Sequence, residues 1–209
     1  KQSAASNLSE EDIDEAWICG AKLLHITGIT PALSESCRKA IRKAVTTARS
    51  AGIPISFDAN LRLKLWDLQT ARETLLSLVC ESTYFLPAYE EGVKLSGLNN
   101  VEKMAEFFYR MGPKAIVIKD GKKGAYLYDR DGGRWISGFP VDEVVDPTGA
   151  GDAFAAGFLS GILNGMPHEE AVRQGNVLGA YAVSVNGDWE GLPTKTELEQ
   201  FFSTEDINR

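Results

Sequence analysis

The sequence predicts an α/β protein with a mostly parallel central sheet and helices on both faces of that sheet. Two observations lead to this prediction. Short apolar runs of strand length alternate with longer segments whose apolar residues recur at helical spacing. The 209 residues are 44% hydrophobic and 24% charged, which is ordinary for a globular chain that buries one sizeable core. We therefore expect a single domain over residues 1–209.

The first half of the chain carries most of this alternation. One helix is expected after Ser34, a suitable N-cap residue, and Gly52 stands where that helix should stop. Strands separated by helices favour parallel pairing, because the chain must cross back over the sheet before each new strand. The expected strands are Lys22–Thr27, Pro54–Asp58, Thr83–Leu86 and Ala115–Lys119, and the helices between them cover about 35–51, 68–79 and 101–111.

The pattern changes after Lys119. Two turn signals, Asp120-Gly121 and Asp131-Gly132-Gly133, precede short strand-like pieces, which predicts a hairpin. The chain then becomes helical again, with a break near 164–167 where Gly and Pro interrupt the pattern. The hairpin strands are expected at Ala125–Tyr128 and Arg134–Ser137, and the two final helices between Gly149 and Val185.

Composition excludes several classes of partner. The net charge of −7 argues against nucleic acid, whose binding usually needs a basic face. No apolar run approaches the roughly 20 residues of a membrane helix. Cys19, Cys37 and Cys80 form no CxxC pair and lie in apolar stretches, so we expect buried free thiols. These features predict a cytoplasmic protein.

The segment 144–161, VVDPTGAGDAFAAGFLSG, carries the strongest chemical signal. Pro147 and the run Gly149-Ala150-Gly151 disfavour a helix, whereas the residues from Asp152 onward favour one. A loop of small residues that enters a helix leaves several backbone N–H groups without partners. Together with the positive end of the helix dipole, these groups form a suitable seat for phosphate oxygens.

Asp152 has two interpretations at this helix start. It is either a carboxylate that complements the helix dipole, or a general base beside an anion-binding loop. The following helix carries Ala153, Gly157 and Gly161 at four-residue spacing, and Gly175 and Gly179 offer a matching stripe on the next helix. These small residues predict that two helix backbones pack unusually close together, which would hold the loop rigidly.

The sequence DPTGAGDAFAAG closely resembles the C-terminal motif of the PfkB, or ribokinase-like, carbohydrate kinases. The resemblance implies a Rossmann-type three-layer α/β/α fold that binds ATP and Mg²⁺, in which family lids often mediate dimers. It also implies that Gly149, Ala150 and Gly151 form an anion hole and that Asp152 deprotonates the sugar hydroxyl. The resemblance begins after the family's N-terminal third, so we expect the first strands and most of the substrate lid to be missing.

Three stretches resemble a narrower group, the 2-keto-3-deoxygluconate kinases; one of them, Ser3–Ile29, carries no obvious catalytic group. In FDANLRLKLW, residues 57–66, the resemblance implies a substrate site of Asp58, Asn60 and Arg62, with the Arg62 guanidinium on the substrate carboxylate. The alternative is a surface arginine paired with Asp58 or Asp67. In NGDWEGLP, residues 186–193, Asp188 would bind a substrate hydroxyl; otherwise it is a turn residue.

The nucleotide side is less distinctive. By resemblance Lys119, Gly121 and Gly124 line the ATP site and Asn176 lies near the adenine, although both glycines also suit a hairpin turn. There is no Walker A motif in the sequence, so the protein is not a P-loop enzyme. Where relatives carry Asn-x-x-Glu, this chain has Ala88 in place of the asparagine and keeps the glutamate.

Two acidic residues complete the expected site. Glu91 is expected to organise Mg²⁺ indirectly, and Asp146 to hold a monovalent cation such as K⁺, both by resemblance. The predicted reaction is ATP-dependent phosphorylation of 2-keto-3-deoxygluconate to its 6-phosphate. Two other functions stay open. One is a fructokinase- or ribokinase-type enzyme for neutral sugars. The other is a non-catalytic kinase-like binding protein, which the replacement of the family asparagine by Ala88 favours.

Overall fold

In a computed structural model of the chain, residues 3–198, 200 and 202 are described, and they fall into two compact units. The first unit runs to Gly121 and resumes at Ala125–Ile136; it contains the whole sheet. The second comprises Lys122–Gly124 and the chain from Ser137 onward, and it contains a pair of long helices. The expectation of a single domain stays a prediction.

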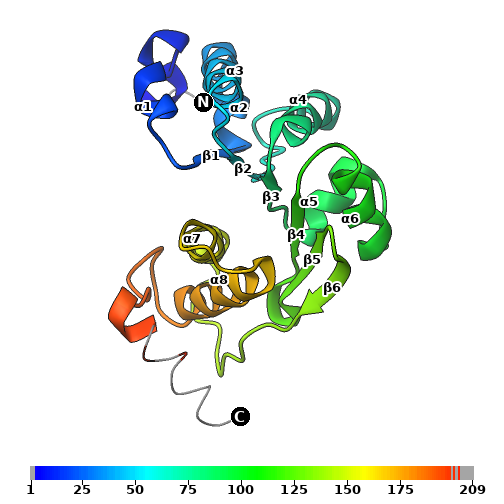
Figure 1. Ribbon diagram of the computed structural model, residues 1–209, viewed down its shortest axis with the longest axis vertical. Helices are drawn as coiled ribbons and strands as arrows, with labels where there is room; N and C mark the ends of the chain where they lie inside the picture. Colours follow the sequence, from blue (N-terminus) through cyan, green and yellow to red (C-terminus); the bar gives the residue numbers. More distant parts are fainter. Residues whose placement is uncertain (1–2, 199, 201, 203–209) are drawn as a thin grey trace. The chain divides into compact units, whose positions relative to one another are not determined.

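The sheet of the first unit has six strands that lie side by side in sequence order (Figure 1). The first four pair in parallel, and the last three form an antiparallel meander. The mostly parallel sheet and its terminal hairpin are therefore confirmed, with boundaries that shift by one or two residues. The strands are β1 (Leu24–Thr27), β2 (Ile55–Asp58), β3 (Tyr84–Phe85), β4 (Ala115–Lys119), β5 (Ala125–Asp129) and β6 (Gly132–Ile136).

One face of the sheet packs against helices of the same unit. Side chains at alternate strand positions, such as Phe57, Phe85 and Ile116, are fully buried in this core. The side chains that point to the other face of the sheet include apolar residues as well, since Val117 and Leu127 are fully buried. Runs that are apolar on both faces are typical of parallel sheets. The helices of this region are α2 (Ile29–Leu33), α3 (Glu35–Ser50), α4 (Leu68–Glu81), α5 (Tyr89–Ser96) and α6 (Val101–Tyr109).

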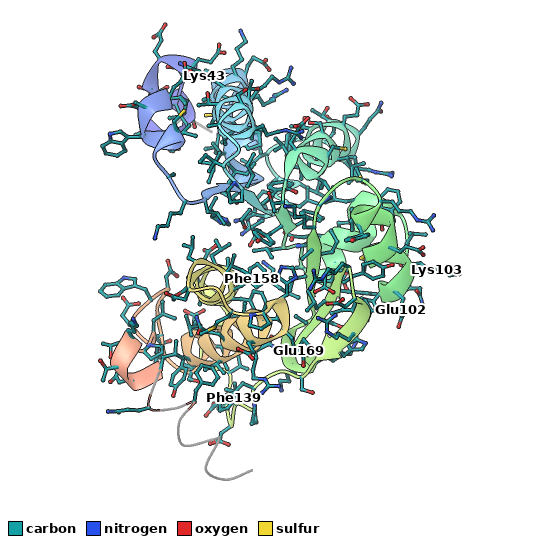
Figure 2. The ribbon with its side chains drawn as sticks, in the orientation of Figure 1. Lys43, Glu102, Lys103, Phe139, Phe158 and Glu169 are labelled. Atoms are coloured by element: carbon teal, nitrogen blue, oxygen red, sulfur yellow. The ribbon has the colours of Figure 1, made fainter. Side chains whose placement is uncertain are left out.

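The N-terminal segment packs on α3. Lys43 of that helix, labelled in Figure 2, donates from Nζ to the Glu10 carbonyl oxygen at 2.9 Å and lies 3.3 Å from a Glu15 carboxylate oxygen. The expectation of three buried thiols was wrong for two of them. All three cysteines are free, but Cys37 alone is buried, because Cys19 and Cys80 lie on the outer faces of their helices. The segment contains η1 (Ala4–Asn7), η2 (Glu10–Asp12) and α1 (Glu15–Cys19).

The second unit is built on α7 (Ala150–Leu163) and α8 (His168–Val183), which lie side by side (Figure 1). The predicted close approach of the two helices is confirmed. A Cβ added at Gly157 would lie 3.0 Å from the Gln174 carbonyl oxygen, and one at Gly175 would lie 2.9 Å from the Phe154 carbonyl oxygen. The turn η3 (Gly121–Lys123) joins the strands β4 and β5. Within the described residues, no helix combines the length and apolarity that crossing a bilayer requires.

Candidate functional site

The N-terminus of α7 has free backbone N–H donors. Gly149 is the N-cap residue and adopts a left-handed conformation with φ of +75°, which a side chain would strain. The first intrahelical bond runs from the Ala153 amide to the Gly149 carbonyl oxygen at 2.8 Å. The amides of Ala150, Gly151 and Asp152 donate to no acceptor among the described residues. They can therefore donate to an anion, as the sequence predicts.

Asp146 joins this loop to the segment that follows α8. Its Oδ1 accepts from the Thr148 amide at 2.9 Å, and its Oδ2 accepts from the Gly187 amide at 3.5 Å. Hydrogen bonds from the Thr148 side chain and backbone lower the pKa of the Asp146 carboxyl below its ordinary value. Both carboxylate oxygens thus hold backbone in place.

The same two segments also meet at Gly149. A Cβ at this position would overlap the carbonyl oxygen of Asp188. The Asp188 side chain itself is exposed, as is that of Asp152 in the first turn of α7. The absence of a side chain at position 149 therefore lets the loop carrying Asp188 lie directly against the start of α7.

The remaining predicted residues of the second unit have structural partners. Asn176 of α8 donates from Nδ2 to the Ser137 carbonyl oxygen at 3.0 Å. Gly124 has φ of +92°, and a Cβ at Gly138 would lie 3.0 Å from the Gly124 nitrogen. This geometry supports the turn interpretation for Gly124. It leaves the predicted contacts of both residues with ATP as proposals.

A buried ion pair lies at the carboxyl end of the sheet in the first unit. Lys119 ends β4 and Asp58 ends β2, and Nζ and Oδ2 are 2.7 Å apart. The Lys119 and Asp58 side chains are only 14% and 7% exposed, so each charge depends on the other. The other carboxylate oxygen of Asp58 accepts from the Asn60 amide at 3.3 Å. Parallel strands that end at one edge bring these residues together.

Glu91 lies beside this pair and connects two loops. Its Oε1 accepts from the Leu61 amide at 2.7 Å, and its Oε2 accepts from the Ala88 amide at 2.9 Å. Burial is the largest influence on Glu91 and raises the pKa of its carboxyl above the ordinary value, with the nearby Asp58 charge adding to the rise. The carboxylate thus already binds two amides, and no described cluster of three or more metal-ligating side chains surrounds it.

Arg62 has an exposed side chain and forms no ion pair with any described residue. The alternative was right that Arg62 is a surface residue and wrong about its pairing, because neither Asp58 nor Asp67 forms an ion pair with it. Asp58 pairs with Lys119, and Asp67 caps α4 by accepting from the Thr70 amide at 2.9 Å. The guanidinium is therefore available for a ligand.

The predicted residues divide between the two units. The pairing of Asp58 with Lys119 was missed by sequence reasoning, although a lysine in the apolar run 115–119 is a signal that a buried cation needs a partner. Gly121, with φ of +50°, faces open space at its Cβ position and fits a turn. The first group is Asp58, Asn60, Arg62, Glu91, Lys119 and Gly121; the second is Gly124, Asp146, Gly149, Ala150, Gly151, Asp152, Asn176 and Asp188.

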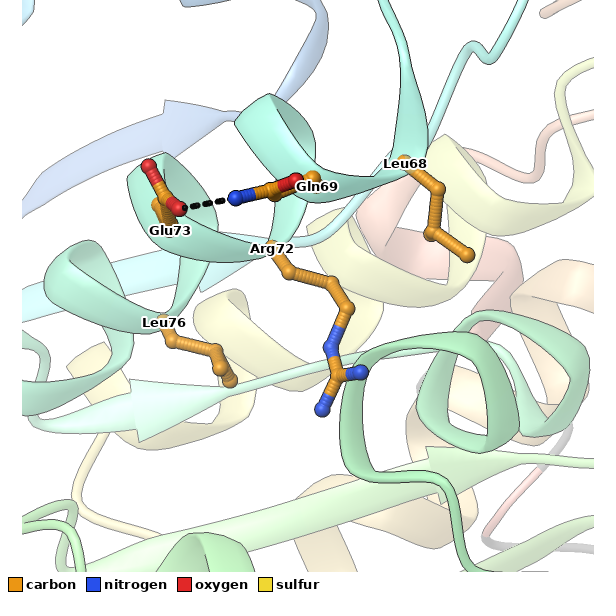
Figure 3. Close-up of a pocket in the computed structure, with 5 residues that line it drawn as sticks. All are labelled: Leu68, Gln69, Arg72, Glu73 and Leu76. Atoms are coloured by element: carbon orange, nitrogen blue, oxygen red, sulfur yellow. Dashed lines mark hydrogen bonds between the residues drawn. The ribbon is translucent and has the colours of Figure 1, made fainter.

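A hollow on the surface of α4 contains none of these residues. It is lined by Leu68, Gln69, Arg72, Glu73 and Leu76, and Gln69 donates to Glu73 across one turn at 3.1 Å (Figure 3). Its lining comes from a single helix and offers one cation beside an acid. This hollow is therefore not the candidate site.

The comparisons with known proteins agree with the motif. Residues 1–195 match the family model described as pfkB family carbohydrate kinase. The chain is 39% identical over 206 residues to the 2-dehydro-3-deoxygluconokinase of Bacillus subtilis (strain 168). This alignment covers 98% of this chain and 64% of that protein. It is 34% identical over 202 residues to the Thermoproteus tenax protein of the same name, covering 96% of this chain and 61% of that protein.

A solved structure supports the same assignment of the fold. An Escherichia coli chain provisionally named ribokinase II, in complex with ATP and Mg²⁺, matches with a TM-score of 0.89 at 31% identity. The match covers 98% of this chain and 66% of that chain. The predicted ribokinase-like α/β class is thus confirmed, and this chain spans less than two thirds of the length of each of these three proteins.

The contact at Gly149 gives a first prediction. Gly149→Ala should lower the free energy of unfolding by about 3 kcal/mol, from left-handed strain plus overlap with the Asp188 carbonyl. Gly165→Ala is the matched control, because Gly165 has φ of +80° but no atom within 4 Å of its Cβ position. That control should lose about 1 kcal/mol in urea denaturation. Equal losses would show that the contact with Asp188 contributes nothing.

The buried ion pair gives a second prediction. Lys119→Met should lower the free energy of unfolding by about 3 kcal/mol, because it leaves the Asp58 carboxylate buried without a cation. Asp58→Asn combined with Lys119→Met should cost less than the two single changes together. The exposed pair of Arg49 with Glu81 is the control, and Arg49→Met should cost less than about 1 kcal/mol. Additive losses in the Asp58 and Lys119 cycle would contradict this account.

Proposed function

The chain belongs to the pfkB family of carbohydrate kinases, and on that premise we propose that it transfers the γ-phosphoryl group of ATP to a hydroxyl of 2-keto-3-deoxygluconate. The product would be the 6-phosphate. The observation that carries the proposal is the start of α7, where the backbone amides of Ala150, Gly151 and the first-turn Asp152 are free. The names of the Bacillus subtilis and Thermoproteus tenax relatives, 2-dehydro-3-deoxygluconokinase, support the choice of substrate.

The proposed chemistry uses the second unit for phosphoryl transfer. Asp152 takes the proton of the sugar hydroxyl while the hydroxyl oxygen forms a bond to the γ-phosphorus. The bond from that phosphorus to the β,γ-bridging oxygen breaks, and ADP is released. The amides of Ala150, Gly151 and Asp152 would donate to the oxygens on which negative charge accumulates. Gly149, Asp146 and α8 keep these donors in place, so little reorganisation is needed during the reaction.

The first unit would select the sugar acid. The Arg62 guanidinium has no acidic partner among the described residues and can bind a carboxylate through two parallel hydrogen bonds. A neutral sugar offers no such group. Asn60, on the same loop, and Asp188, in the second unit, are proposed to contact substrate hydroxyls, whereas the burial of Asp58 against Lys119 favours a supporting role for that carboxylate.

The proposal includes the nucleotide and ions that the family implies. The free amides of α7 fit a phosphate, and bound ATP would supply the phosphoryl group. Glu91 suits an indirect role at Mg²⁺, since it is partly buried and each of its oxygens already accepts from an amide, and Mg²⁺ usually keeps several waters and needs few protein ligands. A K⁺ site near Asp146, homo-oligomerisation and a cytoplasmic location stay proposals; the three free cysteines suit a reducing compartment.

The role of Asp152 predicts a selective loss of turnover. In the full-length protein, Asp152→Asn should reduce kcat for sugar-dependent ADP release by about 10²–10⁴-fold. The affinity for ATP should change little, because the amide donors remain. Asp142→Asn, with the same charge change at an exposed residue ten positions earlier, should retain normal turnover. Undiminished turnover in Asp152→Asn would remove this residue from the mechanism, and ATP binding without transfer in the unmodified protein would favour a non-catalytic function.

The role of Arg62 predicts a change in substrate preference. Arg62→Ala should lower kcat/KM for 2-keto-3-deoxygluconate by about 100-fold, because a bidentate charged contact is lost. The KM for ATP and the weak use of neutral sugars should stay within about twofold. Lys64→Ala removes a positive charge two residues further along the same exposed loop and should leave all three quantities unchanged. Equal losses for acidic and neutral sugars would contradict carboxylate binding by Arg62.

A further inference from the structure

The loop that follows β2 carries the proposed substrate residues outside regular secondary structure. Asn60 lies on it with φ of +35°, the one described residue other than glycine with a positive φ. Such a conformation is uncommon for a side-chain-bearing residue and persists where the surroundings hold it. Arg62 follows two positions later, so the direction of its side chain depends on how this loop is held.

Two carboxylates hold the loop by accepting from the two backbone amides that precede Arg62. Asp58 accepts from the Asn60 amide at 3.3 Å, and Glu91 accepts from the next amide, that of Leu61, at 2.7 Å. The Glu91 contact is the shorter and has the better geometry for a charge-assisted hydrogen bond. Leu61 itself is buried, so this contact holds an interior residue of the loop, whereas the side chain of the next residue, Arg62, is exposed.

Each of these two carboxylates has a second partner that holds it in place. Asp58 is paired with the buried Lys119 of β4 at 2.7 Å. Glu91 lies in the first turn of α5, and its second oxygen accepts from the Ala88 amide at the N-cap of that helix at 2.9 Å. Ala88 has no side chain that could accept from a first-turn amide, so the contact of Glu91 with the Ala88 amide is the one half of a capping box that this helix start forms. Glu91 is thus a rigid link between the start of α5 and the loop after β2.

We propose that Glu91 is a positioning residue for the sugar acid: by holding the Leu61 amide it sets the loop that presents Asn60 and Arg62 to the substrate. This inference rests on the proposed function. It differs from the expectation, drawn from the family resemblance, that the glutamate organises Mg²⁺. The two roles predict different kinetic defects, because a displaced loop weakens sugar binding whereas a disturbed metal weakens the use of Mg²⁺.

Glu91→Gln is the variant that separates these roles. It nearly preserves the size of the side chain, but a glutamine has a single acceptor oxygen and an NH₂ group that cannot accept from the second amide. Glu90→Gln is the matched control, since Glu90 precedes Glu91 on α5 and is exposed. If Glu91→Gln does not fold, Glu91→Asp keeps the charge and both oxygens but is one methylene too short to reach both amides.

The experiment measures kinetics and amide exchange on the same full-length proteins. For Glu91→Gln we expect kcat/KM for 2-keto-3-deoxygluconate to fall about 10-fold, as for a lost hydrogen bond to a charged group. The KM for ATP and the Mg²⁺ concentration that gives half-maximal velocity should stay within about twofold. Hydrogen–deuterium exchange of the peptide covering 59–65 should accelerate about 10-fold relative to the unmodified protein and Glu90→Gln.

The outcomes distinguish this inference from the proposed function. A raised requirement for Mg²⁺ with an unchanged sugar KM would overturn the positioning role in favour of the metal role. Unchanged exchange of the 59–65 peptide in Glu91→Gln would overturn it whether or not the protein is active. Faster exchange in a protein whose unmodified form phosphorylates no sugar acid would support the link between α5 and the loop but refute the proposed substrate.

Discussion

Close backbone packing at Gly149 is the constraint on which the proposed chemistry depends. With no side chain at this position, the segment containing Asp188 lies against the start of α7, and the residue can adopt its left-handed conformation. Asp146 also joins the same two segments, through the Thr148 and Gly187 amides. The small residues shared by α7 and α8 then bring the two helix backbones together. The donors at the helix start are therefore held in place before any anion arrives, which is the condition for efficient electrostatic stabilisation.

In the first unit, charged side chains rather than close backbone packing hold the candidate site residues in place. Its strands end at one edge of a parallel sheet, where Asp58 and Lys119 pair and Glu91 binds two backbone amides. Buried charges of this kind seldom increase stability compared with apolar side chains, so we ascribe to them a role in holding the geometry of the loop after β2. The exposed Arg62 follows directly in the chain after Leu61, whose amide Glu91 binds.

Much of the fold and part of the site could be predicted from the sequence. Apolar periodicity indicated the parallel strands, the hairpin after Lys119 and the break between the last two helices, because burial pattern and turn residues are local properties. The glycine stripes predicted the contact between α7 and α8 for the same reason. The partners of Asp58, Glu91 and Lys119 depend on which strands become neighbours, and these residues are far apart in the chain. The short helix α5 was missed because Ala88 at its N-cap has no polar side chain, so the sequence carries no N-cap signal at this position.

We propose that the start of α7 catalyses phosphoryl transfer to a sugar acid. The most direct measurement is mass-spectrometric detection of the sugar product after incubating the full-length protein with Mg-ATP and 2-keto-3-deoxygluconate. Fructose and ribose, incubated separately, provide the neutral comparison. We predict a singly phosphorylated sugar acid that accumulates together with ADP, and little product from the neutral sugars. ATP binding without phosphorylation of any sugar, or preferential phosphorylation of fructose or ribose, would contradict the account.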